Sequence, residues 1–89
     1  MQVTTIHYNQ RFAERFQKLP LIIKKKALIA EQKFRLNAFH PSLRLHKLSG
    51  RLKGLWSISI DKKYRILFEA LEDGNIVFNS IGTHAIYEN

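Results

Sequence analysis

Three strand patterns in close succession, joined by two short turns, constrain the fold of this chain more than any other feature of its sequence. The patterns occupy residues 55–60, 64–69 and 76–81. In the first of them Trp56, Ile58 and Ile60 alternate with polar residues, and this period of two is typical of a strand with one buried face. The Asp73-Gly74 pair before the last pattern favours a tight hairpin turn. The sequence therefore predicts three consecutive strands that pair antiparallel.

The N-terminal part of the chain predicts one strand followed by two helices. Residues 3–8 are rich in β-branched and aromatic side chains, which favours a short strand. The period then changes, because Phe12, Phe16 and Leu19 recur at spacings of four and three residues. Pro20 suits the first turn of a second helix, where its missing N–H group costs nothing.

The second predicted helix is long and carries both apolar and basic side chains. It extends to about Asn37, since the residue before Pro41 disfavours the helical conformation. We predict an apolar face that includes Leu21 and Leu28, and a cationic face that includes the lysines at 24–26. The two helices are expected to form an antiparallel hairpin.

Residues 43–54 predict an irregular basic loop between the helices and the strands that follow. The element order is therefore β-α-α-β-β-β. We predict an α+β fold in which a twisted, mostly antiparallel sheet packs on a two-helix hairpin. The chain has 89 residues and shows no repeat or linker, so a single domain over residues 1–89 is expected.

Positive charge is concentrated in the first two thirds of the chain. Residues 1–40 and 41–65 each carry a net charge of +6, whereas residues 66–89 carry −4, for a total of +8. This asymmetry favours a polyanionic partner, nucleic acid first, and a merely solvated surface is the alternative. The absence of cysteine excludes disulfides and thiolate metal sites. No signal-peptide pattern or membrane-spanning apolar run is visible, so we expect a cytoplasmic location and no membrane partner.

Motifs around the hairpin and at the end of the chain resemble those of a known family. A Leu-x-Gly-x-x-x-Gly-Leu-Trp-Ser run over residues 48–57 leads into the hairpin, Tyr64-Arg65-Ile66 opens the next strand, and Gly82-Thr83-His84 follows the last one. With the helices before them, these motifs are similar to the RelE/ParE superfamily of type II toxin–antitoxin toxins, and most of all to its YafQ, HigB and RelE branch. The resemblance covers nearly the whole chain and implies a RelE-like fold.

The resemblance also implies an activity and partners. Toxins of this branch are ribosome-dependent endoribonucleases that cut mRNA in the decoding site, so mRNA, the ribosome and a cognate antitoxin are the expected partners. A hetero-oligomer with that antitoxin is expected. The reaction needs no metal and no other cofactor, because the attacking 2′-hydroxyl belongs to the RNA itself.

Four residues are implied by the resemblance as catalytic: Arg65, His84, Tyr87 and His46. An arginine is always charged and can hold phosphate oxygens, and a histidine with its ordinary pKa of about 6.5 can act as acid or base. Other roles stay open for each residue. Arg65 can instead pair with a nearby carboxylate, His84 can be merely exposed, Tyr87 can anchor the tail, and His46 can be an ordinary loop residue.

Five basic residues flank this predicted site and are expected to contact RNA phosphates: Lys47, Arg51, Lys53, Lys62 and Lys63. The same surface can receive an acidic antitoxin. Three serines depart from the family pattern, since Ser57 and Ser59 replace histidine or lysine and Ser80 replaces an arginine. Two alternative functions therefore remain, a ParE-like inhibitor of DNA gyrase and a catalytically weak member that binds RNA or a partner.

Overall fold

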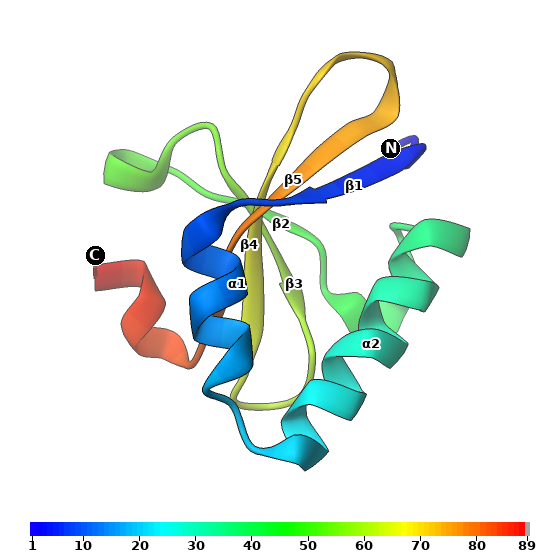
Figure 1. Ribbon diagram of the computed structural model, residues 1–89. Coiled ribbons are helices and arrows are strands. Elements are labelled where there is room, and N and C mark those ends of the chain that lie inside the picture. The colour runs from blue at the N-terminus through cyan, green and yellow to red at the C-terminus, as the bar shows by residue number, and fades with distance from the viewer. Residues whose placement is uncertain (89) are drawn as a thin grey trace.

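The computed structural model describes residues 1–88, without the side chain of Glu88, and places two helices on one face of a five-stranded sheet (Figure 1). The strands are β1 (Thr5–Tyr8), β2 (His46–Lys47), β3 (Trp56–Ser59), β4 (Arg65–Ala70) and β5 (Asn75–Gly82), and the helices are α1 (Gln10–Gln17) and α2 (Leu21–Leu36). Short 3₁₀ turns are η1 (Pro41–Leu43), η2 (Gly50–Leu52), η3 (Glu72–Gly74) and η4 (His84–Glu88). The predicted α+β fold is confirmed, with one additional strand.

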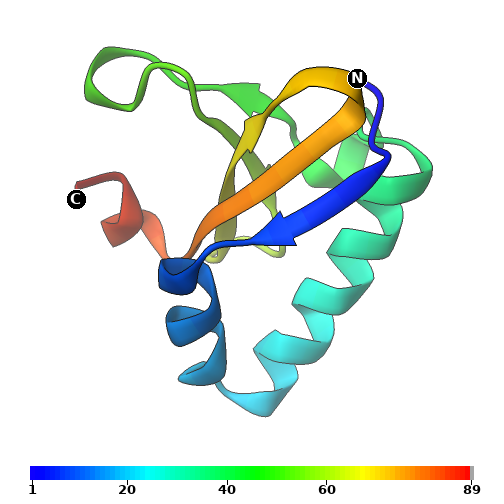
Figure 2. The same cartoon turned by 45° about the horizontal axis from the view of Figure 1, so that its top comes forward.

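The sheet has the order β1-β5-β4-β3-β2. β1 runs parallel to β5, and all other neighbouring strands pair antiparallel, so the prediction of a mostly antiparallel sheet is confirmed. Figure 2 shows the twist of this sheet and the two helices on one side of it. Between β4 and β5, Asp73 and Gly74 have φ values of 58° and 77°, which are the positive angles that a tight hairpin turn requires.

The additional strand β2 lies within the segment predicted to be an irregular loop, and that prediction is wrong for its two residues. His46 pairs with Ser57, and Lys47 pairs with Trp56. A two-residue strand at the edge of a sheet is too short to show a period of two in the sequence. The pairing puts His46 on the same sheet face as Ser57, because residues that pair directly in an antiparallel ladder share a face.

The two helices begin where capping chemistry predicts. The side chain of Asn9 accepts a hydrogen bond of 2.9 Å from the backbone N–H of Phe12 and so caps α1. Pro20 directly precedes α2. The helices run in opposite directions, as expected for a hairpin (Figure 1). Among the described residues, no helix is long and apolar enough to cross a membrane.

α2 packs against the sheet, but not with the face that contains Leu21 and Leu28. These two side chains are 68% and 53% exposed. The buried residues of the helix are Ile23, Ala27, Ala30 and Phe34. The two alanines leave room for the helix to approach the sheet, and the Phe34 ring lies 4.9 Å from the Phe68 ring. α2 is apolar on more than one side, so the spacing of its apolar residues did not decide which side is buried.

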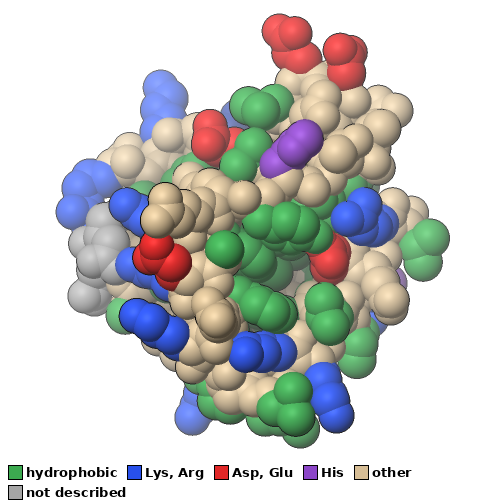
Figure 3. All heavy atoms as spheres, in the orientation of Figure 1, with side chains coloured by type: hydrophobic (Ala, Val, Ile, Leu, Met, Phe, Trp, Pro, Cys, Tyr) green, Lys and Arg blue, Asp and Glu red, His purple; other side chains and the backbone are tan. Residues whose placement is uncertain are grey.

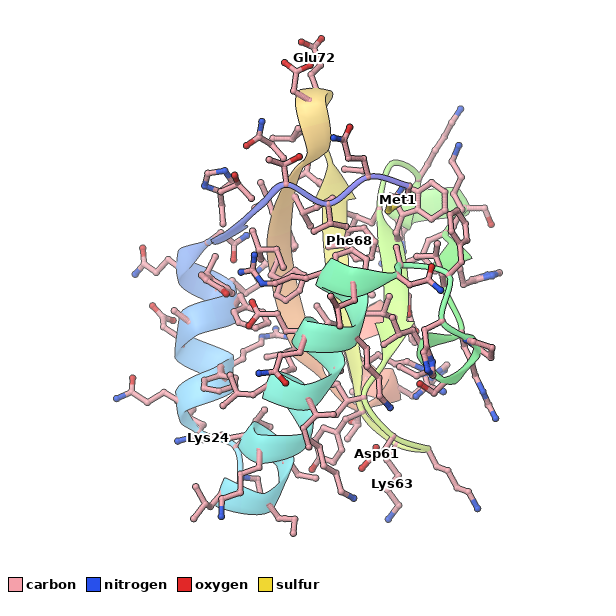
Figure 4. The ribbon with its side chains drawn as sticks, turned by 90° about the vertical axis from the view of Figure 1, so that its right-hand side faces the viewer. Met1, Lys24, Asp61, Lys63, Phe68 and Glu72 are labelled. Atoms are coloured by element: carbon pink, nitrogen blue, oxygen red, sulfur yellow. The ribbon has the colours of Figure 1, made fainter. Side chains whose placement is uncertain are left out.

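The sheet separates an apolar core from a second face that carries polar residues. The core side includes Ile58, Ile66, Phe68, Ile76 and Phe78, all buried against the helices. On the other face, which we call the open face, Ser57, Ser59 and Ser80 are nevertheless only 3%, 5% and 3% exposed. Figure 4 shows the helices in front of the sheet, Phe68 behind α2, and Asp61 and Lys63 at the opposite end of the sheet from Glu72.

Candidate functional site

A surface hollow of about 520 Å³ opens where the β3–β4 turn, the start of β4 and η4 meet. It is lined by Lys62, Lys63, Arg65, Thr83, His84 and Tyr87. Three residues predicted to be catalytic and two predicted to bind RNA therefore lie around one hollow. Residues distant in sequence meet here because Arg65, the first residue of β4, pairs with Gly82, the last residue of β5.

The guanidinium of Arg65 is held by backbone carbonyl groups. Its Nη1 donates to the carbonyl oxygen of Asp61 at 2.7 Å and to that of Tyr64 at 3.1 Å. The sequence left open an ion pair of Arg65 with the carboxylate of Asp61 or Glu69, and neither pair occurs among the described residues. Carbonyl oxygens orient the guanidinium without neutralising it, so its positive charge remains available to an anion in the hollow.

The Asp61 side chain shapes the turn that holds Arg65. Its Oδ1 accepts hydrogen bonds from the backbone N–H groups of Lys63 at 2.9 Å and Tyr64 at 2.8 Å, and its Oδ2 lies 3.4 Å from Lys26 Nζ. Burial alone would raise the pKa of the Asp61 carboxyl, but the backbone N–H groups of Tyr64 and Lys63 and the Lys26 ammonium lower that pKa below its ordinary value. The ionised carboxylate therefore stabilises the turn.

η4 carries two more side chains of the hollow, and Thr83 directly precedes it. His84 is exposed, and its ring lies 5.0 Å from the Tyr87 ring in an edge-on contact. The Tyr87 hydroxyl lies 3.0 Å from Ser57 Oγ on β3. Ile86, between them in sequence, is only 5% exposed, and a Cβ atom at Gly82 would lie 2.6 Å from its Cγ2. The glycine thus permits η4 to pack closely on the end of β5, and Tyr87 does anchor the tail of the chain.

His46 is the predicted catalytic residue that does not line the hollow. It is exposed on β2, and the pairing of β2 with β3 places it opposite Ser57. His46 therefore lies on the open face beside Ser57. Ser57 Oγ in turn contacts the Tyr87 hydroxyl of η4. The structure therefore brings Arg65, His84 and Tyr87 together and leaves His46 beside them.

The five predicted RNA contacts fall into two groups. Lys62 and Lys63 are exposed in the turn that borders the hollow. The other three are Lys47 on β2, Arg51 in η2 and Lys53 directly after η2. This part of the chain precedes β3 and so lies near the end of β3 that is distant from the hollow. Figures 1 and 2 both show the η2 segment and η4 projecting on the side of the sheet away from the helices. Arg51 and Lys53 on one side, and Lys62 and Lys63 on the other, therefore flank the open face from its two ends. Lys47 pairs with Trp56 and its Nζ lies 5.6 Å from the Trp56 ring, so its side chain lies on the core face of the sheet.

One residue near the open face was missed by sequence reasoning. Arg15, in the last turn of α1, donates a hydrogen bond of 3.0 Å from Nη1 to Ser80 Oγ. Ser80 occupies the strand position where the family resemblance implies an arginine. In this structure the guanidinium of Arg15, from α1, reaches that position. Arg15 follows the ordinary pattern of an exposed helix position, so no sequence signal distinguishes it.

The described residues contain no group of three or more His, Cys, Asp or Glu side chains that could hold a metal ion. The Ser59 hydroxyl, opposite Arg65 in the sheet register, is buried without a hydrogen-bond partner within the described part of the chain. The donors available around the hollow are thus a guanidinium, an imidazole, a phenol, two ammonium groups and the Thr83 hydroxyl.

Comparisons with solved structures show the same fold in several bacterial toxins. YafQ from E. coli strain BL21(DE3) is 17% identical, with a TM-score of 0.74 over 96% of this chain and 98% of that one. The YoeB/ParE toxin from Agrobacterium tumefaciens is 14% identical, with a TM-score of 0.76 over 91% and 99%. The E. coli DinJ–YafQ toxin–antitoxin complex gives 18% identity and a TM-score of 0.71 over the full length of both chains.

Comparison with curated proteins finds no match. A family profile does match, and it describes the RelE-like toxin of the type II toxin–antitoxin system HigB. The match spans residues 7–84 of the 89, from β1 to the start of η4. The chain therefore belongs to the family of RelE-like HigB toxins of type II toxin–antitoxin systems.

Proposed function

We propose that this toxin is an endoribonuclease that cuts mRNA on the ribosome, and that the hollow around Arg65 and His84 is its active site. The observation that carries the proposal is the meeting of an unneutralised guanidinium and an exposed imidazole in one hollow bordered by two lysines. These groups suit a reaction on a phosphodiester, in which negative charge develops on the phosphate oxygens and protons move at two other oxygens.

In the proposed reaction a ribose 2′-oxygen attacks the adjacent phosphorus atom, and the bond from phosphorus to the 5′-oxygen breaks. A base takes the 2′-hydroxyl proton, and an acid gives a proton to the leaving 5′-oxygen. The products are a 2′,3′-cyclic phosphate and a free 5′-hydroxyl. Arg65 stabilises the charge on the phosphate, and His84 serves as the acid or the base.

Tyr87 and His46 have supporting roles in this proposal. The Tyr87 hydroxyl contacts Ser57, so the phenol positions η4 and keeps His84 in the hollow. His46, opposite Ser57, supplies a second titratable group on the open face. Lys62 and Lys63 hold RNA phosphates at the hollow, and Lys47, Arg51 and Lys53 hold phosphates of mRNA or ribosomal RNA at the other end of β3.

The test is cleavage of a defined mRNA by the purified chain, mapped by primer extension with and without ribosomes. Cuts that need ribosomes and vanish in both Arg65→Ala and His84→Ala support the proposal. Full cleavage by both variants would show that the catalytic assignment is wrong. If the chain instead inhibits supercoiling by DNA gyrase and leaves mRNA intact, it acts as a ParE-like toxin.

One observation favours a second candidate, a member of the family that binds RNA or a partner but cleaves weakly. Ser57, Ser59 and Ser80 are all buried, and two of their hydroxyl groups are engaged by Tyr87 and Arg15. They therefore add no donors to the hollow beyond those named above. Ribosome binding without cleavage in the same assay would establish this candidate.

We infer a cognate antitoxin as the second partner. The DinJ–YafQ complex, which is similar in fold, is a toxin–antitoxin complex. A net charge of +8 favours an acidic partner surface, and the lysines around the hollow are the groups that such a partner would cover.

A further inference from the structure

A small pocket of about 250 Å³ lies where α2, η1 and the end of β3 meet. Its polar lining consists of Lys26, Lys33, Ser42, Ser59 and Asp61, and we call it the β3-edge pocket. It shares no lining residue with the hollow that contains Arg65. It is also separate from the larger hollow of about 430 Å³ between α1 and α2, around which Figure 3 shows hydrophobic side chains.

The backbone of Ser59 faces the β3-edge pocket. The N–H of the next residue, Ile60, donates to the carbonyl oxygen of Tyr64 at 2.9 Å, on the side of β4. In an antiparallel ladder the backbone groups of neighbouring residues point to opposite edges, so the N–H and carbonyl groups of Ser59 point away from β4. β2 pairs only with Trp56 and Ser57, so no strand reaches Ser59 at that edge. Because Ser59 lines the pocket, these two backbone groups face it.

The chain before β2 turns away from Ser59. Arg44 would lie opposite Ser59 if the ladder continued, but it adopts a left-handed conformation with φ 47° and ψ 51°, and its N–H donates to the carbonyl oxygen of Pro41 at 3.3 Å. At this edge, neither the N–H nor the carbonyl oxygen of Ser59 has a hydrogen-bond partner among the described residues. Ser59 is nevertheless only 5% exposed. A buried N–H group without a partner is rare in folded proteins, so this one requires an acceptor.

Two ammonium groups border the β3-edge pocket. Lys33 Nζ donates to Ser42 Oγ at 3.2 Å and makes no salt bridge among the described residues. Lys26 Nζ lies 3.4 Å from the Asp61 carboxylate. The two lysines and the one aspartate that line the pocket give it a net charge of +1. A monoanion neutralises this charge, whereas a phosphate monoester, with a charge of about −1.5 to −2 at pH 7, exceeds it.

The other walls of the β3-edge pocket are aliphatic. They come from Ile29, Ala30, Leu43 and Ile60, of which Ala30 and Leu43 are only 4% and 1% exposed. Sites for drug-sized ligands have volumes of about 300–1,000 Å³, so this pocket suits a smaller molecule. Cationic donors together with aliphatic walls favour an anion that carries a short hydrocarbon tail.

We propose that the β3-edge pocket binds a small aliphatic carboxylate. The carboxylate oxygens accept hydrogen bonds from the Ser59 N–H and the Lys33 ammonium, and the tail packs against Ile29 and Leu43. The ligand thus gives the buried N–H the acceptor that the sheet does not supply. The carboxylate belongs either to a free acid or to the end of a peptide chain, since both present the same chemistry. This site is independent of the proposed nuclease reaction.

The probe is isovalerate, added to the full chain and followed in the amide proton–nitrogen correlation spectrum. The Ser59 amide should show the largest shift, because its N–H gains a charged acceptor. The expected dissociation constant is about 1 mM, as suits a ligand with few atoms. Isovaleramide lacks the charge and acetate lacks the tail, so each should bind at least about tenfold more weakly.

A second probe, N-acetylleucine, distinguishes the two sources of the carboxylate. It presents the carboxylate as the last residue of a peptide chain does. Tighter binding than that of isovalerate would identify a chain end as the source, and weaker binding would identify a free acid. Both orders support the proposal.

Substitutions in the pocket test the assigned contacts. Lys33→Met should weaken isovalerate binding about tenfold or more, because it removes a charged donor. Lys25→Met is the matched control, since Lys25 lies on the same helix but does not line the pocket, and it should leave the affinity unchanged. Ile29→Ser should weaken binding through lost apolar contact. The Ile29 side chain is 53% exposed, so this variant should fold even if Lys33→Met does not.

Four results would overturn the proposal. They are no shift of the Ser59 amide with isovalerate, equal binding of isovaleramide, equal binding of glycerol phosphate, and an affinity of Lys33→Met and Ile29→Ser equal to that of the parent chain. The first result would mean that water alone satisfies the Ser59 N–H. No RNA or ribosome is present in the titration, so its outcome and that of the cleavage assay are independent.

Discussion

Replacing Gly82 by alanine tests whether the packing of η4 on β5 holds the proposed catalytic side chains in place. The new Cβ would lie 2.6 Å from Ile86 Cγ2, whereas carbon atoms in contact prefer about 3.5–4.0 Å. Gly82 is not among the residues with positive φ, so alanine fits the backbone itself. The substitution therefore perturbs one contact, and one partner must move by about 1 Å.

The size of the effect follows from the two ways in which the chain can respond. If Ile86 stays in place, overpacking of this kind costs about 1–3 kcal/mol. If η4 detaches instead, the chain loses the burial of an isoleucine side chain, which is worth about 1.5–3 kcal/mol. Either response lowers the free energy of unfolding by about 2 kcal/mol. Cleavage should fall more steeply, because detachment of η4 removes both His84 and Tyr87 from the hollow.

Urea unfolding, followed by the fluorescence of Trp56, gives the free energy, and primer extension on ribosomes gives the cleavage rate. The matched control is the double variant with Ile86→Ala, which removes Cγ2 and should be no less stable than Ile86→Ala alone. Parent-like stability and cleavage of Gly82→Ala would refute the described packing of η4. If the losses of unfolding free energy from Gly82→Ala and Ile86→Ala simply add in the double variant, the contact between the two residues is not the cause of the destabilisation by Gly82→Ala.

Arg65→Ala and His84→Ala should each lower the cleavage rate by a factor of about 10²–10³, the usual loss of one transition-state contact, while thermal unfolding stays parent-like. Tyr87→Phe should cost about 0.5–1.5 kcal/mol in urea unfolding through its lost bond to Ser57, with a smaller drop in cleavage, and an unchanged unfolding curve would contradict the bond. The pKa of Asp61 is lowered by folding, so its carboxylate adds stability above the unfolded pKa of about 3.9, and this stability is lost as pH falls through the folded pKa. Asp61→Asn should therefore reduce the acid dependence of unfolding, and identical acid unfolding curves would contradict this. Association with the antitoxin should slow as salt rises, because exposed charges are screened within about 8 Å at physiological ionic strength, and a rate indifferent to salt in stopped-flow measurements would exclude the basic surface as its target.

The strands were predictable from the sequence because apolar and polar residues alternate in them and because the Asp-Gly pair between two of them readily adopts the positive φ angles of a tight turn. The side chains of Trp56 and Ile58 face the core, as the period of two predicted, and Asp73 and Gly74 form the expected turn. The strand β2 was not predictable, since two residues carry no period and only the neighbouring β3 satisfies their hydrogen bonds. Its edge position depends on a long-range contact, which local patterns do not encode.

Three residues that the sequence predicted to be catalytic line one hollow, but the geometry of that hollow was not predictable from the sequence. Arg65 and His84 were expected together because of the family resemblance, and the register that pairs Arg65 with Gly82 is what brings them into one hollow. Their chemical roles stay predictions. Two features of the geometry were not predictable. The backbone carbonyls that orient the guanidinium depend on the exact shape of the β3–β4 turn, and the bond from Arg15 to Ser80 depends on how segments far apart in the chain approach each other.

Asp61 lies where the two sides of the molecule meet, and its bonds explain why the shape of the hollow does not depend on the contact with α2. Its carboxylate reaches across to Lys26 of α2, while its carbonyl oxygen accepts from Arg65. The ion pair is partly exposed, and such pairs contribute about 0–1 kcal/mol. The two backbone hydrogen bonds from Lys63 and Tyr64 hold the turn independently of Lys26. Lys26→Met, which removes the ion pair, should therefore leave the turn, and with it the orientation of the Arg65 guanidinium, in place.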